Sequence, residues 1–289
     1  MYRCIIFNNF ITHGIILIIP GLIFDYGINV DSKGLRVFDG QDADAGEYPY
    51  IVALFLKNRN ELNIEKYRYF CTGSAITPTW TLTAGHCISV TKSKIMNTRI
   101  HKLVIRYVIE TDNITWYTSD IVDTMLHPNY KLRQNIQKKI YVKNDIALVK
   151  TEKTLISEFG RLSTVDYRTM FGHKVTAAGY GRMNTEEGTV GNTIKLNNSL
   201  QAFDAVIIKC NDHHVRNLVH PSFCLAWECE YPSTTCPGDS GAPIIHPTGI
   251  IAVNSAGTNR DCRRERLYAS ISTPISPFLD WITNNIGTL

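Results

Sequence analysis

Beyond residue 50 the chain alternates short apolar segments with polar turns. Six segments are rich in Val, Ile, Thr and aromatic residues and are separated by clusters of Gly, Pro, Asn and Asp; they cover residues 50–56, 73–82, 102–107, 145–150, 174–178 and 250–253. Helical periodicity is sustained only in residues 275–286. The apolar residues that recur there at helical spacing are Phe278, Trp281, Ile282 and Ile286. Many short strands followed by one helix predict an all-β protein, either a barrel or a sandwich.

Near the N-terminus, residues 14–24 form an almost unbroken apolar run that follows a basic residue. Eleven residues would rise only about 16 Å as a helix, well short of the ~30 Å hydrocarbon core of a bilayer. The run has the length of the apolar region of a signal peptide. We therefore expect residues 1–27, with an approximate boundary, to be a signal peptide, and the protein to be secreted, extracellular and free of the membrane after its removal. An uncleaved signal anchor is the alternative, and the polar residues Asn8, Asn9 and His13 disfavour it.

Length and composition fit one soluble globular domain. The chain has 289 residues, of which 44% are hydrophobic and 19% charged, so a single large all-β domain could bury a sizeable core. The formal net charge is only +4, and no block of Lys and Arg and no basic motif interleaved with aromatic residues occurs. We therefore expect no nucleic-acid partner.

The chain contains eight cysteines, of which Cys4 would leave with the signal peptide. The remaining seven are an odd number, so at least one lacks a partner within the chain. Zinc binding is the competing interpretation, but no pair of CxxC or Cys/His units has zinc spacing. His213, His214 and His220 lie close together, where exposure or local hydrogen bonding suits them better than ligation. We expect no metal and no cofactor, and secretion favours disulfides.

Three separate segments carry candidate chemistry: 82–87, which contains His86; 144–149, which contains Asp145; and 236–243, which contains Ser240. Each has a structural alternative, and the small residues around Ser240 could simply form a turn. An Asp that enters an apolar run is costly when buried without a partner, so Asp145 must cap, pair or orient something. A serine hydroxyl is a poor nucleophile until a base removes its proton, and that base works best when a carboxylate holds its tautomer. The three together indicate nucleophilic catalysis by Ser240.

The three segments resemble the signature blocks of the trypsin/chymotrypsin family of serine proteases. The matching residues are Thr-Ala-Gly-His-Cys at 83–87, Asp-Ile-Ala-Leu at 145–148 and Gly-Asp-Ser-Gly at 238–241. The resemblance extends from Val37 to the C-terminus and includes residues 178–181, 255–257 and 280–282. It implies that residues 37–289 form a serine protease domain of two antiparallel six-stranded β-barrels (chymotrypsin-like) with a C-terminal helix.

The resemblance also implies a role for each residue of the site. His86 would act as general base and then general acid, Asp145 would orient it, and Ser240 would be the acylated nucleophile. The backbone N–H groups of Gly238 and Ser240 would form the oxyanion hole. Ser255 would hydrogen-bond near Asp145.

Three disulfides follow from the same resemblance: Cys71–Cys87, Cys210–Cys224 and Cys236–Cys262. Cys229 is then left over. A free thiol and an intermolecular link are both open for it.

Arg36 and Val37 resemble the family's activation site, although Val-Phe-Asp-Gly departs from the common Ile-Val-Gly-Gly. Residues 28–36 would be a short propeptide, removed by a trypsin-like activator that cuts after Arg36. In this family the new α-amino group is buried against the acid that precedes the nucleophile, here Asp239. A buried carboxylate without a partner is strongly disfavoured, which would couple the cut to the conformation of the site.

The expected substrate pocket differs from that of trypsin. Its floor would be Thr234, where a trypsin carries Asp, so a preference for Lys or Arg before the cut is not expected. Ser255 and Gly257 would line the pocket. Arg266 would either project into it and bind an acidic side chain bidentately, or face solvent or a nearby Glu in a rearranged loop. An acidic residue and a small or apolar one therefore both stay open as the preferred residue before the cut.

Three smaller departures accompany these. Gly85 replaces a common Ala and Ala242 replaces a common Gly, and we expect both to be tolerated. Ala256 replaces a common aromatic residue, which should loosen the wall over the substrate backbone.

The sequence thus predicts a secreted serine endopeptidase that hydrolyses protein or peptide substrates through an acyl-enzyme, with macromolecular inhibitors as further partners. A non-catalytic homologue that acts as a binding or decoy protein is the alternative, although such homologues usually lose a residue of the triad. An esterase of the α/β-hydrolase type is excluded, because it needs G-x-S-x-G and a nucleophile that precedes its acid. Asn113 and Asn197 begin sequons and are candidate glycosylation sites.

Overall fold

The structure, a computed structural model, describes residues 41–44, 46–59, 65–95, 102–109, 115–134, 140–181, 200–210, 218–227, 235–236, 238–257 and 270–287. All of these belong to one compact unit, Leu35–Leu289.

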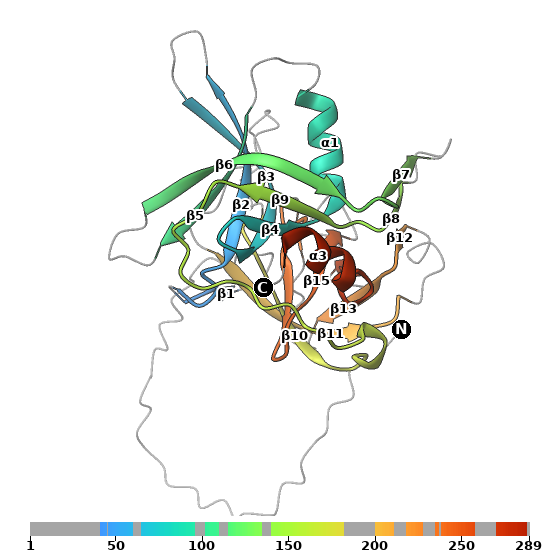
Figure 1. The fold of residues 1–289 in the computed structure, drawn as a ribbon. Coiled ribbons are helices and arrows are strands. Elements are labelled where there is room, and N and C mark those ends of the chain that lie inside the picture. The colour runs from blue at the N-terminus through green and yellow to red at the C-terminus, as the bar shows by residue number, and fades with distance from the viewer. Residues whose placement is uncertain are drawn as a thin grey trace, which may run out of the picture. The chain divides into compact units, whose positions relative to one another are not determined.

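The N-terminal half of this unit forms a closed barrel of six strands (Figure 1). In order around the barrel they are β2 (Ile51–Arg59), β3 (Glu65–Thr77), β4 (Trp80–Thr83), β9 (Ala147–Thr151), β6 (Thr115–Leu126) and β5 (Lys102–Ile109). Every neighbouring pair is antiparallel, and β2 closes the ring by pairing with β5.

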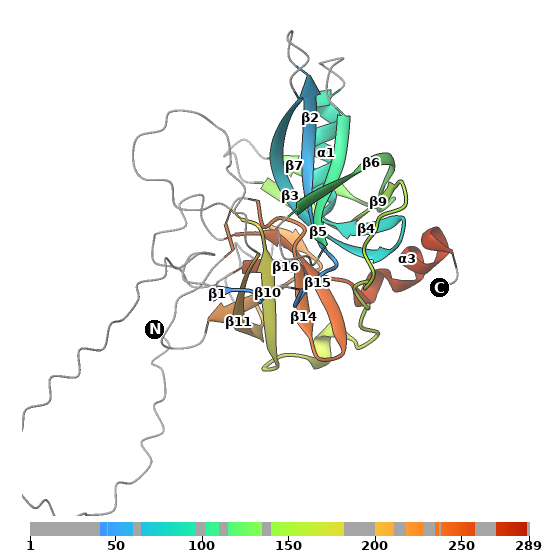
Figure 2. The same ribbon diagram turned by 90° about the vertical axis from the view of Figure 1, so that its left-hand side faces the viewer.

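The C-terminal half forms a second ring of six antiparallel strands (Figure 2). Around the ring they are β11 (Gln201–Ile208), β10 (Lys174–Gly179), β14 (Pro243–His246), β15 (Gly249–Ala256), β16 (Ser270–Pro274) and β13 (Phe223–Trp227). Pairing of β13 with the last residues of β11 closes the ring, and β1 (Gln41–Asp42) pairs with the first residues of β11. The prediction of two six-stranded antiparallel barrels is confirmed.

The period of two in the strands gives each barrel a buried inner face. In β11 buried and partly exposed residues alternate, so that Phe203, Ala205 and Ile207 point inward while Asp204 is exposed. An apolar cluster joins the C-terminal helix to strands of both barrels. Its buried members are Ile76, Trp80, Leu82, Ile146, Leu148, Val253, Ile275, Phe278 and Ile282.

Several elements differ from the pattern-based prediction. Residues 73–82, expected as one strand, end β3 and form most of β4, because a turn at Pro78 and Thr79 divides them. The expected helix over 275–286 consists of the 3₁₀ turn η2 (Ser276–Phe278) and α3 (Leu279–Ile286). A second 3₁₀ turn, η1 (Tyr167–Thr169), precedes β10.

One helix was not predicted at all. Helix α1 (Gly85–Ile95) follows β4 directly, and its sequence carries no sustained apolar stripe. Cys87 and Ile88, in its first turn, are buried in the core of the first barrel. Tertiary packing of this turn therefore holds the helix, since its periodicity does not.

A small third sheet was also not predicted, and its strand β8 (Ile140–Lys143) ends two residues before Asp145. It consists of β7 (Lys131–Gln134), β8 and β12 (Val219–His220), with β8 and β12 parallel. In the described part of the chain, no helix is both long and apolar enough to cross a bilayer.

Candidate active site

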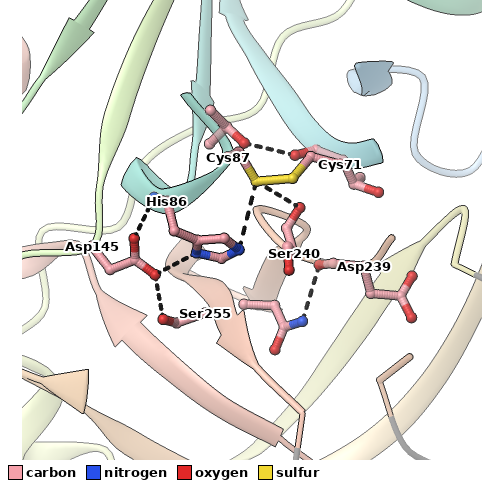
Figure 3. A network of polar contacts seen from close by, with 10 residues as sticks. Cys71, His86, Cys87, Asp145, Asp239, Ser240 and Ser255 are labelled. Carbon is pink, nitrogen blue, oxygen red and sulfur yellow. Dashed lines mark hydrogen bonds and ion pairs between the residues drawn. A yellow bond between two sulfur atoms is a disulfide. The ribbon is translucent and has the colours of Figure 1, made fainter. Parts of the chain in front are cut away.

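The three candidate residues come from separate parts of the chain and lie together in the fold (Figure 3). His86 is the second residue of α1, Asp145 lies between β8 and β9, and Ser240 lies in the turn before β14. The first two belong to the N-terminal barrel and the third to the C-terminal one. A backbone hydrogen bond of 2.9 Å from the N–H of Thr72, in β3, to the carbonyl of Ser240 joins the two sides.

Asp145 is completely buried, and its carboxylate is fully engaged. Oδ1 accepts the backbone N–H of His86 at 2.7 Å. Oδ2 lies 2.8 Å from His86 Nδ1 and also accepts a hydrogen bond from the hydroxyl of Ser255. A carboxylate can only accept, so Nδ1 carries the proton and the neutral imidazole presents Nε2 as an acceptor.

The two groups shift each other's pKa. Burial alone would lower the pKa of His86, but the charge of Asp145 and the hydrogen bond between them outweigh it, so the pKa is raised above 6.5. Burial likewise opposes ionisation of Asp145, yet the charge and hydrogen bonds of His86 and the bond from Ser255 hold its pKa below 3.8. The arrangement favours an imidazole that gains a proton readily beside a carboxylate that stays ionised.

The imidazole of His86 lies between Asp145 and Ser240, with Nε2 on the side of Ser240 (Figure 3). The side chain is 24% exposed, so a reactant can approach it. Within the described residues the Ser240 hydroxyl makes no hydrogen bond. Bonds between a nucleophile and its base are often long in unliganded sites and tighten when substrate binds.

Cys71, His86 and Cys87 place potential metal-ligand atoms within 4.8 Å of one another. Both sulfurs, however, are joined in the disulfide Cys71–Cys87. A disulfide sulfur is not the thiolate that binds a metal, so this cluster does not suit one.

The backbone of the Ser240 turn leaves two donors unused. The N–H of Asp239 donates to the carbonyl of Cys236, whereas those of Gly238 and Ser240 donate to no group among the described residues. Gly238 has φ +108°, which side chains rarely allow, and a Cβ on Gly241 would come within 2.1 Å of the Thr83 hydroxyl. Two glycines are thus needed for this turn, whose two unused N–H groups are donors of the kind that an anion-stabilising site requires.

Asp239 points away from this site and into the second barrel. It is buried, and its two oxygens accept backbone N–H groups from Gly181 at 2.7 Å and from Cys236 at 2.8 Å. Burial raises its pKa to about 6, although these two hydrogen bonds act in the opposite direction. A Cβ on Gly181 would lie 2.2 Å from the carboxylate, so glycine is required there for close approach.

The structure places only part of the predicted pocket. Ser255, in β15, faces Asp145, and Gly257 directly follows that strand and is exposed. The other predicted pocket residues, Thr234 and Arg266, lie outside the described residues. So do Arg36 and Val37 of the activation site, the glycosylation candidates Asn113 and Asn197, and Cys229 and Cys262.

Two of the three predicted disulfides are confirmed, Cys71–Cys87 and Cys210–Cys224. Cys236 is also disulfide-bonded, to a cysteine outside the described residues. The first disulfide anchors the turn of α1 that carries His86 to β3.

The comparisons with known proteins identify the family. Residues 37–282 match the family model described as trypsin, which covers most of the chain. The chain belongs to the trypsin family. Together with the relatives described next, this match indicates a serine endopeptidase, which is a hydrolase.

Among relatives, serine protease 1 of Drosophila melanogaster is 27% identical over 259 residues, covering 87% of this chain and 86% of that protein. Brachyurin of Leptuca pugilator is 25% identical over 253 residues, covering 87% and 99%. Ovochymase of Halocynthia roretzi is 25% identical over 279 residues, and the match spans 91% of this chain but only 16% of that protein.

The fold has a counterpart among solved structures. Neuropsin, a serine protease expressed in the limbic system of mouse brain, superposes with a TM-score of 0.63 at 18% identity, covering 86% of this chain and 99% of the other. At this identity the likeness concerns the fold.

The structure adds residues that the sequence reasoning missed. Asn254, in β15, donates through Nδ2 to the carbonyl of Asp239 at 3.0 Å and so supports the Ser240 turn of this trypsin-family chain. Its only signal was a polar residue inside the apolar run of β15. The structure also explains the glycine at position 85, because a Cβ there would lie 2.8 Å from the ring of Tyr130.

Proposed function

We propose that this chain is a secreted serine endopeptidase that cleaves peptide bonds through an acyl-enzyme. Support comes above all from the Asp145 carboxylate, which holds the His86 imidazole in the tautomer whose free nitrogen lies on the side of Ser240. A base with its tautomer fixed in this way is what a serine hydroxyl needs to become a nucleophile.

Each residue then has one task. His86 Nε2 takes the proton of Ser240 Oγ as that oxygen attacks the substrate carbonyl, and later gives it to the leaving amine. Asp145 stabilises the imidazolium that forms in between, in keeping with the raised pKa of His86. Water then attacks the acyl-enzyme with His86 again as base, which releases the second product and restores the serine.

The oxyanion hole would consist of the N–H groups of Gly238 and Ser240. Both lack an acceptor among the described residues, and both flank Asp239, whose own N–H is used. As negative charge develops on the substrate oxygen, two preoriented donors stabilise it without reorganisation.

We further propose that the enzyme is made as a precursor and activated by a trypsin-like protease that cuts after Arg36. Asp239 supports this, because among the described residues its buried carboxylate is held by two neutral N–H groups only, and its pKa is raised to about 6. The new ammonium of Val37 would supply the missing charge, as in the trypsin family. An Arg36→Ala precursor that stays unprocessed yet shows full activity would refute this.

The residue before the cut is proposed to be acidic, small or apolar, and not Lys or Arg. Thr234 at the expected floor offers no charge to a basic side chain, and Arg266 could pair with an acidic one. Rates on matched Asp, Ala, Phe and Arg substrates would test this. An Arg substrate cleaved fastest would contradict the proposal.

The decisive experiment for the activity uses the form that begins at Val37 and a fluorophosphonate probe. Labelling is expected for the wild type and not for Ser240→Ala, which leaves the fold intact. If the folded, correctly cut wild type were not labelled, a non-catalytic homologue with a binding or decoy role would replace the enzyme as the best explanation.

A further inference from the structure

We propose that the hydroxyl groups of Tyr69 and Thr72 are positioning groups for the oxyanion hole, because together they hold the carbonyl of Gly238. This inference rests on the proposed peptidase function and deepens it. Neither residue belongs to the three signature segments, and both lie in β3 of the first barrel.

The contacts form a closed triangle of oxygens. The Tyr69 hydroxyl donates to the carbonyl of Gly238 at 2.5 Å, and the Thr72 hydroxyl lies 3.0 Å from the same carbonyl. The two hydroxyls are 2.7 Å apart. Since two hydrogens must serve three contacts, the Tyr69 hydrogen belongs to the shorter bond, and that of Thr72 is shared between the carbonyl and the Tyr69 oxygen.

Burial makes this triangle rigid. Tyr69 is 1% exposed and Thr72 is not exposed at all, so no water competes for the carbonyl. The Tyr69 ring packs against Phe55, with ring centroids 5.6 Å apart. Burial first and the nearby charge of Asp239 second raise the pKa of Tyr69, so its hydroxyl stays a neutral donor.

The ring and the hydroxyl of Tyr69 act on the same residue. A Cβ on Gly238 would lie only 2.6 Å from the Cε1 atom of the ring. The ring thus fixes where Gly238 sits, while the hydroxyl fixes the direction of its carbonyl. Because a peptide group is planar, a fixed carbonyl also fixes the whole link between Gly238 and Asp239.

Three successive carbonyls are held in this way. That of Gly238 accepts the two hydroxyls, that of Asp239 accepts Asn254 Nδ2, and that of Ser240 accepts the N–H of Thr72. Thr72 therefore donates two hydrogen bonds to the turn, one from its side chain and one from its backbone N–H. The N–H of Ser240 lies in the same peptide plane as the Asp239 carbonyl, which Asn254 holds. The N–H of Gly238 lies in the preceding peptide link, and it is restrained because the Tyr69 ring and the two hydroxyls fix the position and the carbonyl of Gly238 itself. Both N–H groups of the proposed oxyanion hole are therefore restrained.

The test uses the form that begins at Val37 and the variants Tyr69→Phe, Thr72→Val and their combination. Loss of the hydroxyls lets the Gly238 peptide rotate, which should lower kcat and leave KM within about twofold. We expect the double variant to lose at least about tenfold in kcat, and less than the about 10²–10³-fold cost of removing an oxyanion donor. Affinity for a peptide aldehyde, whose adduct places an oxyanion in the hole, should fall in parallel.

Two controls separate positioning from general stability. Tyr107→Phe also deletes the hydroxyl of a buried tyrosine in the first barrel, one that accepts the N–H of Leu155 at 3.0 Å, and should leave kcat unchanged. Thr72→Ser keeps the hydroxyl and should retain kcat. The comparison of Thr72→Ser with Thr72→Val therefore tests the hydroxyl even if Tyr69→Phe proves too unstable to assay.

Unchanged kcat in the double variant, or an equal loss in Tyr107→Phe, would overturn the positioning role alone. A wild type without Ser240-dependent activity would instead overturn the proposed function, and this inference with it.

Discussion

The Ser255 hydroxyl, from the second barrel, donates a hydrogen bond to the buried Asp145 carboxylate, which belongs to the first. The two residues are 110 positions apart in the chain. Asp145 Oδ2 thus has two hydrogen-bond partners, His86 of the first barrel and Ser255 of the second. The second barrel therefore helps to stabilise the negative charge of a carboxylate that belongs to the first.

Ser255→Ala should therefore destabilise the fold and do so most at neutral pH. A hydrogen bond to a charged group contributes about 1.5–3 kcal/mol, and its removal leaves a buried carboxylate less well satisfied. The bond helps to hold the pKa of Asp145 below 3.8, so its contribution is present above that pH and is lost as the pH falls through the folded-state value.

Urea unfolding of the two proteins between pH 3 and pH 7 would measure this effect. Ser270→Ala is the matched control, since it removes a buried hydroxyl of the same barrel whose only hydrogen-bond partner among the described residues is Ser272, at 3.4 Å. A Ser255→Ala deficit that did not shrink in acid would contradict the electrostatic explanation.

The acid limb of the pH–rate profile should report on His86. The raised pKa of this imidazole means that kcat/KM should rise with an inflection above pH 6.5 as the base loses its proton. Asp145→Asn removes the charge that raises the pKa, so the inflection should move to lower pH while kcat falls by about 10⁴-fold, as in other Ser-His-Asp triads. An inflection that stayed in place in Asp145→Asn would argue against the charge of Asp145 as its cause.

Asp239 should make precursor stability fall as the pH rises. Its pKa is raised from 3.8 to about 6, so the folded precursor binds a proton more tightly than the unfolded chain between these values. The free energy of unfolding should consequently decline from about pH 4 to about pH 6. Denaturant titrations of the Arg36→Ala precursor across this range would measure the slope.

The form cut after Arg36 is the informative comparison. Pairing of the Val37 ammonium with Asp239 would lower that pKa and abolish the decline. Asp239→Asn should abolish it in the precursor as well. Identical slopes in precursor and cut protein would mean that the new N-terminus does not reach Asp239.

Removal of either of the two described disulfides should lower stability, but only removal of Cys71–Cys87 should also lower activity. Their sequence separations are 16 and 14 residues, so loss of either should cost a similar amount, about 3 kcal/mol by chain entropy. Only Cys71–Cys87 is attached next to His86, so its replacement by two alanines should also lower kcat/KM. The paired replacement of Cys210–Cys224 supplies the control, and an equal loss of kcat/KM in both would show that the effect is one of stability.

The sequence by itself determined the strand-rich class, the C-terminal helix and the three chemistry-bearing segments. These are local properties: period-two patterning, turn residues, and a base, an acid and a nucleophile in recognisable surroundings. The pattern left barrel and sandwich open, because strand pairing and closure are not local, and the family resemblance supplied the barrels. Helix α1 escaped detection since its sequence carries no sustained apolar stripe, although Cys87 and Ile88 of its first turn pack in the core.

Only the tertiary structure decided how the site is held. Asp145 meets Ser255 across 110 residues, and Tyr69 meets Gly238 across 169. Closure of two separate barrels creates both contacts, and no pattern within β3 distinguishes the hydroxyl of Tyr69 from that of any other buried tyrosine. The sequence thus predicts which groups would react, while contacts made in the folded chain set the tautomer of His86, the charge of Asp145 and the conformation of the Ser240 turn.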